Sequence, residues 1–81
     1  MRDAFRVVVR NALGAYEFRC DERIVVGELK AAIGRALDVR PCQLLLYHYE
    51  VPLVDDTLAL RRFSRAGEVS LRMQVTIFVP T

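Results

Sequence analysis

The apolar residues of this chain change their spacing along the sequence, and the order of these changes limits the folds open to it. Between residues 5 and 20 they recur at every second position, the spacing of a half-buried strand. Between residues 25 and 37 they recur at every third or fourth position, the spacing of an amphipathic helix. The two-residue spacing then returns. This order predicts an α+β fold in which one helix covers a sheet.

The first two apolar runs predict a β-hairpin. Phe5–Arg10 is rich in β-branched residues, and Ala15–Cys20 alternates strictly between apolar and charged positions. The segment Asn11–Gly14 between them contains Asn and Gly, which favour turns. A short glycine-containing loop between two such runs is typical of a hairpin.

The helix is expected to run from Val25 to about Leu37. Its apolar residues lie on one stripe, formed by Val26, Leu29, Ile33 and Leu37. Asp38–Pro41 is expected to end the helix, because the residue before a proline avoids the helical conformation. Gly34, inside the helix, is expected to let it lie close to the sheet.

In the second half of the chain, the residue pattern predicts shorter elements. They are a third strand at Gln43–Tyr49, a short irregular or edge strand at Val51–Val54, a helical or 3₁₀ turn at Leu58–Leu60 and a last strand at Val69–Met73. The expected order is therefore β-β-α-β-β-(3₁₀)-β, in a mixed sheet of four to five strands. We expect one domain over residues 1–81, with a core at 5–74. Because the alternation continues through Val75, Ile77 and Val79, residues 75–81 are expected to extend the last strand or form an ordered tail.

These segments resemble ubiquitin and its relatives. Val26–Ile33 is similar to the family's I-x-x-V-K-x-x-I helix, and Pro41–Leu46 to its P-x-x-Q-x-L segment. Leu53–Leu58 is similar to its L-x-D-x-x-T-L loop, one residue shorter, and Gly67–Leu71 to its final strand. The resemblance covers Phe5 to about Gln74 and implies a ubiquitin-like β-grasp fold. Another β-grasp domain, of the Ras-binding type, would share this order and offer a different binding edge.

Little in the sequence indicates catalysis. His48, the only histidine, lies beside leucines of the expected third strand, with no nucleophile near it in the sequence. Asp55 and Asp56 precede Thr-Leu, as turn formers and helix caps do. Cys20 and Cys42 form no C-x-x-C pair and lack metal-ligand spacing. We therefore expect no enzyme, no cofactor and no metal site.

The sequence predicts a soluble protein, and its two cysteines, too few for a disulfide scaffold, favour the cytoplasm or nucleus. Apolar residues make up 53% of the chain, enough for a folded core. No apolar stretch approaches the ~20 residues that cross a bilayer, and the first residues lack the apolar region of a signal peptide. We therefore expect no membrane partner. Twelve basic and ten acidic residues leave a net charge of +2, which disfavours a dedicated nucleic-acid binder.

The C-terminal sequence argues against a conjugated modifier. The resemblance implies that modifiers end in a flexible tail with a terminal Gly-Gly, whereas Thr76–Thr81 is β-branched, aromatic and rich in neither glycine nor charge. Lys30 is the only lysine and falls at the position of the family's helix lysine. We expect a non-conjugating ubiquitin-like domain, at the N-terminus of a larger intracellular protein. A modifier or a precursor is the alternative.

The resemblance implies a protein-binding site on the outer face of the sheet. Its expected residues are Arg10, Leu13 (or Ala12), Leu45, Tyr47, Tyr49, Val51, Ser70 and Arg72. Tyr47 and Arg72 replace aliphatic residues of the family, so ordinary ubiquitin receptors are not expected to bind. Tyrosine and arginine are nevertheless common at binding hot spots, and an exposed apolar strand face indicates a partner. The alternative is that the tyrosines merely coat the sheet, which their β-propensity allows.

Two other kinds of partner remain open. Arg10, Arg72 and the tyrosines could stack and pair with single-stranded RNA, although the apolar tail and small net charge disfavour it. The apolar residues 75–79 could hold two copies together weakly. The expected partner is a protein, which the sequence does not identify.

Overall fold

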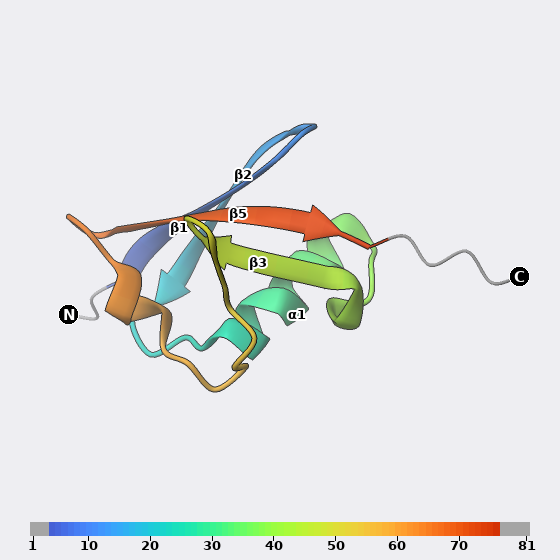
Figure 1. Cartoon of the computed structure of the whole chain (residues 1–81). Helices are drawn as coiled ribbons and strands as arrows, with labels where there is room; N and C mark the ends of the chain where they lie inside the picture. The colour runs from blue at the N-terminus through green and yellow to red at the C-terminus, as the bar shows by residue number, and fades with distance from the viewer. Residues whose placement is uncertain (1–3, 77–81) are drawn as a thin grey trace, which may run out of the picture.

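The computed structural model describes residues 4–76, in which a five-stranded mixed sheet lies over a single helix (Figure 1). The elements are β1 (Ala4–Asn11), β2 (Gly14–Asp21), α1 (Val26–Leu37), the 3₁₀ helix η1 (Pro41–Gln43), β3 (Leu44–His48), β4 (Val51–Pro52), the 3₁₀ helix η2 (Leu60–Phe63) and β5 (Glu68–Val75). The strand order is β2-β1-β5-β3-β4, with β1 and β5 parallel and the other neighbours antiparallel. The predicted α+β fold, a ubiquitin-like β-grasp, is confirmed.

The core lies between α1 and the inner face of the sheet. Val26, Leu29 and Ile33 of the predicted helical stripe are fully buried, and Leu37 is half-buried. They cluster with inward-facing residues of every long strand: Phe5, Val7, Val9, Cys20, Leu44, Leu46, Val69, Leu71 and Met73. No polar or charged residue between 4 and 76 is buried. Apolar burial by one helix is therefore what stabilises the sheet.

A distant loop completes the start of α1. The N–H groups of Val26 and Gly27 donate to the carbonyls of Leu58 (3.0 Å) and Asp56 (2.9 Å). The first N–H groups of a helix have no partner within the helix, so these bonds satisfy donors that would otherwise be unpaired. The ammonium of Lys30, whose side chain is only 14% exposed, lies 3.2 Å from the Asp56 carboxylate. These contacts hold the loop between β4 and η2 against the helix.

The helix ends at Leu37 as predicted, but the cause is a left-handed residue. Asp38 has φ 58°, and the N–H of Val39 donates to the carbonyl of Gly34 (2.9 Å). The expectation that Gly34 brings the helix close to the sheet is wrong. A Cβ at Gly34 would lie 2.7 Å from the Val39 carbonyl oxygen, so the absent side chain makes room for the chain leaving the helix.

The predicted bounds of the elements in the second half were each wrong by about one to three residues. The third strand ends at His48, because Tyr49 has φ 58° and starts a turn. The edge strand β4 is limited to Val51–Pro52. The 3₁₀ helix begins at Leu60, whose N–H donates across the chain to the carbonyl of Ile24 (3.0 Å).

The end of the last strand is held by Gln43. The N–H of Thr76 donates to the Gln43 carbonyl (2.7 Å), and the Gln43 side-chain amide donates to the Thr76 carbonyl (3.2 Å). The strand β5 reaches Val75, two residues beyond the predicted Met73, and the expected extension over residues 75–81 stays a prediction. Ile77 and Val79, which carried the rest of that expectation, lie outside the described residues.

We predict that Leu29→Ala and Ile33→Ala each lower the free energy of unfolding by about 2–5 kcal/mol, because both side chains are fully buried in a one-helix core. Denaturant midpoints with an unchanged slope would measure this. Val54→Ala, at a position that is 80% exposed, is the control and should change little. Unchanged midpoints for both core variants would contradict the helix register.

We also predict that Gly34→Ala destabilises the domain. This is the opposite of what helix propensity alone predicts, since alanine in a helix interior is more stable than glycine by about 1 kcal/mol. The new methyl group would overlap the Val39 carbonyl, and such overpacking typically costs about 1–3 kcal/mol. Thermal unfolding of this variant can be compared with Arg35→Ala, an exposed neighbour in the same helix. A midpoint raised above wild type would show that the Val39 carbonyl moves aside without loss.

Candidate functional site

A row of three side chains crosses the middle of the outer sheet face. The register pairs Arg10 of β1 with Arg72 of β5, and Arg72 with Tyr47 of β3. Directly paired residues lie on the same face of a sheet, and the alternate residues of these strands are buried against α1. The sequence-predicted residues Arg10, Tyr47 and Arg72 are therefore brought together.

Tyr47 and Arg72 contact each other directly. The guanidinium carbon of Arg72 lies 4.5 Å from the centroid of the Tyr47 ring, within cation–π distance. Tyr47 is half-buried, and Leu45, two residues earlier on the same face, is 40% exposed. The pair holds a broad, partly apolar surface in a fixed position on the central strands.

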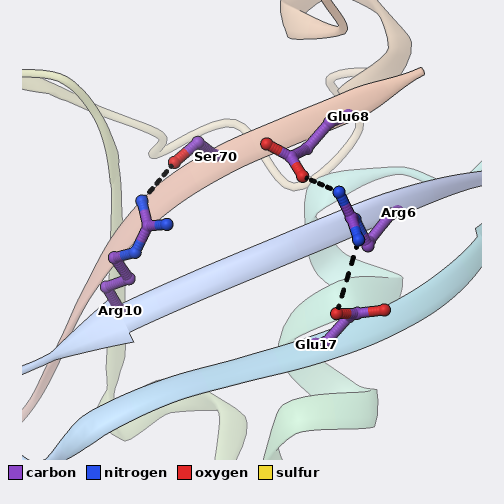
Figure 2. A network of polar contacts seen from close by, with 5 residues as sticks. All are labelled: Arg6, Arg10, Glu17, Glu68 and Ser70. Carbon is purple, nitrogen blue, oxygen red and sulfur yellow. Dashed lines mark hydrogen bonds and ion pairs between the residues drawn. The ribbon is translucent and has the colours of Figure 1, made fainter. Parts of the chain in front are cut away.

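Ion pairs neutralise the neighbouring part of this face, as Figure 2 shows. Arg6 lies between Glu68 (2.6 Å) and Glu17 (3.8 Å). Arg10 instead donates to the Ser70 hydroxyl (3.1 Å). Within residues 4–76, neither Arg10 nor Arg72 forms an ion pair, so both positive charges on this part of the face are left unneutralised. We call Arg10, Leu45, Tyr47, Ser70 and Arg72 the outer-face patch.

The remaining predicted site residues lie around this patch. Leu13 is 89% exposed in the β1–β2 turn, while its neighbour Ala12 lines a hollow of about 360 Å³ together with Arg10 and Arg72. Val51, which was expected on the outer face, pairs with His48 and therefore lies on the opposite face of the sheet from Tyr47, whereas Pro52 pairs with Tyr47. Pro52 therefore shares the face of Tyr47, which sequence reasoning missed because it depends on the register of a two-residue strand.

Tyr49 belongs to a second hollow of about 670 Å³ beside the patch. The hollow lies between the β3–β4 turn and the η2–β5 connection, and reaches Ser70. The His48 ring packs against Phe63 (centroids 4.5 Å apart) and Tyr49 (4.7 Å). Sequence reasoning missed the lining residues Arg62, Phe63 and Arg65. The sequence feature that could have indicated them is an aromatic residue that stands among arginines.

The perturbed titratable groups lie away from the patch. Burial raises the pKa of the Cys20 thiol on the inner face. Hydrogen bonds from the Thr57 hydroxyl (2.6 Å) and N–H (2.9 Å) lower the pKa of Asp55 in the β4–η2 loop. Across residues 4–76, no three His, Cys, Asp or Glu side chains gather closely enough to hold a metal ion. No helix in that range is long and apolar enough to cross a membrane.

We predict that Arg6→Ala and Arg72→Ala each change the free energy of unfolding by less than about 1 kcal/mol. Both side chains lie on the exposed face, where ion pairs contribute little. Urea titration measures this, with Leu46→Ala as the buried counterpart that should lose about 2 kcal/mol or more. A loss as large for Arg72→Ala would mean that the face serves stability.

Comparison with known proteins relates the chain to others through its structure. No protein-family model and no curated protein matches it. The N-terminal ubiquitin-like domain of the 4931431F19Rik protein is 21% identical, with a TM-score of 0.80 over 100% of this chain and 83% of that one. The ubiquitin-like domain of Arabidopsis thaliana At2g32350 is 18% identical, with a TM-score of 0.79 over 96% and 82%.

Ubiquitin of Caldiarchaeum subterraneum is also similar, with 17% identity and a TM-score of 0.78 over 96% of this chain and 99% of that one. Identities this low establish the fold and leave the function open. The chain is a domain with the ubiquitin-like β-grasp fold.

Proposed function

We propose that this domain recruits another protein without covalent attachment, by binding it on the outer-face patch. The observation that carries the proposal is the contact between Arg72 and Tyr47 on the exposed face. It presents a large aromatic ring and a guanidinium together, and these are the groups most enriched at binding hot spots.

The sheet gives the patch a rigid base. β5 lies between β1 and β3 and is hydrogen-bonded on both sides, and its inner residues Val69, Leu71 and Met73 are buried. The backbone of such a strand loses little conformational entropy when a partner binds, which favours affinity. Arg72 is further restrained by the Tyr47 ring.

The chemistry of the patch restricts the partner. Leu45 and the Tyr47 ring supply the apolar centre, and Arg10 and Arg72 supply positive charge at its side. A matching partner would place an apolar or aromatic side chain against Tyr47 and a carboxylate near the arginines, which bind carboxylates in a two-pronged geometry. A groove shaped for small aliphatic residues would not accept Tyr47.

The domain acts in this proposal as a binding module, without catalysis, in a larger protein of the cytoplasm or nucleus. One structural relative is an N-terminal ubiquitin-like domain, which supports a module of this kind. Both cysteines, Cys20 and Cys42, are free thiols, the usual state in those compartments.

We predict that Tyr47→Ala abolishes partner capture while the domain stays folded, because truncating a central anchor typically costs about 2 kcal/mol or more of binding. Proteins from lysate retained by wild type should be lost with Tyr47→Ala and kept with Tyr47→Phe, which preserves the ring beneath Arg72. Quantitative mass spectrometry of the retained proteins gives the comparison.

Val54→Ala, at an exposed position off the sheet face, should capture the wild-type set. The proposal fails if Tyr47→Ala retains the same proteins as wild type at the same strength.

A further inference from the structure

The two edges of the sheet differ in how well they are protected from pairing. The β4 edge is two residues long and contains Pro52, which has no N–H to donate. The opposite edge, β2, is eight residues long and has no proline. It pairs with β1 residue for residue, without a bulge, from Asn11–Gly14 to Ala4–Asp21. Within residues 4–76 no strand lies beyond β2, so its outer side is open to another strand.

We propose that β2 pairs antiparallel with β2 of a second copy of this chain, about a two-fold axis through Phe18. The two sheets would then join into one, with both helices on the same side. In this register, residues 15–21 of one copy face residues 21–15 of the other. The proposal concerns a surface separate from the outer-face patch and does not depend on it.

Charge complementarity and strand overlap together select this register, because a pairing centred on Cys20, which would also place Arg19 opposite an acid, Asp21, would join only residues 19–21 of each strand. Glu17 and Arg19 both point to the outer face of β2, and antiparallel partners must share a face. Centred on Phe18, the pairing places Glu17 opposite Arg19 of the second copy, and Arg19 opposite Glu17, so that two opposite-charge pairs form. The neighbouring registers that respect the faces are centred on Glu17 or on Arg19. The first places Glu17 opposite Glu17 of the second copy, and the other places Arg19 opposite Arg19. Like charges directly opposite each other are destabilising.

Both charged side chains are available for this contact. Arg19 is exposed and forms no ion pair or side-chain hydrogen bond with any residue from 4 to 76. Glu17 lies 3.8 Å from Arg6, and both side chains are more than half exposed, so that pair is weak. On the inner face, the half-buried ring of Phe18 would meet its symmetry copy, extending the apolar core across the axis.

Sedimentation of the whole chain tests the proposal. Wild type should show a monomer–dimer equilibrium at concentrations up to about 1 mM, the weak end of specific association. Glu17→Arg and Arg19→Glu should each weaken dimerisation about tenfold or more, because both facing pairs become like-charged. Mixed together, the two variants should form a heterodimer, since every facing pair is then of opposite charge.

Matched controls carry the same charge changes away from the edge. Glu50 lies in the β3–β4 turn, and Arg35 lies on the exposed side of α1. The variants Glu50→Arg and Arg35→Glu should both dimerise as wild type does. A wild type that stays monomeric throughout this range overturns the proposal. So does a dimer that the two single charge reversals leave unchanged, which would place the contact elsewhere, such as at residues 75–79.

Discussion

The packing of one helical stripe against one sheet face is the contact on which the rest of the structure depends. Val26, Leu29 and Ile33 are the fully buried side chains of α1. They belong to one core cluster with the inward-facing residues of β1 and β5. Because α1 covers a single face, the other face of the sheet stays open to solvent. The same arrangement that stabilises the fold therefore provides a flat, rigid surface whose side chains are free to serve binding.

Polar contacts fix the position of the segments that this packing alone would leave loose. The carbonyls of Leu58 and Asp56 hold the β4–η2 loop to the start of α1, and Gln43 holds the end of β5. All are made to backbone groups that would otherwise lack partners. They explain how a small domain, with little apolar area to bury, keeps long loops in defined positions.

The elements that could be predicted from the sequence are those with a strong local period: the hairpin, α1 and β5. What could not be predicted depends on contacts between distant segments. The bond from Leu60 to Ile24 sets the start of η2 and with it the hollow lined by Phe63. Likewise, the left-handed Tyr49 ends β3 early and directs its ring into that hollow. The central row of the patch, formed by Arg10, Tyr47 and Arg72, could be predicted only from the resemblance to the ubiquitin family. The spacing of the residues within each strand does not tell which strands lie side by side.

The parallel pairing of β1 with β5 joins segments far apart in the chain, as in the contact between Arg6 and Glu68, 62 residues apart. During translation, β1 emerges from the ribosome long before its neighbour β5 exists. Until then the nascent hairpin has an open edge on β1 and an uncovered apolar face. Closing the central pair last means a high contact order, which slows folding. A domain of this topology is therefore most vulnerable to aggregation while it is being synthesised.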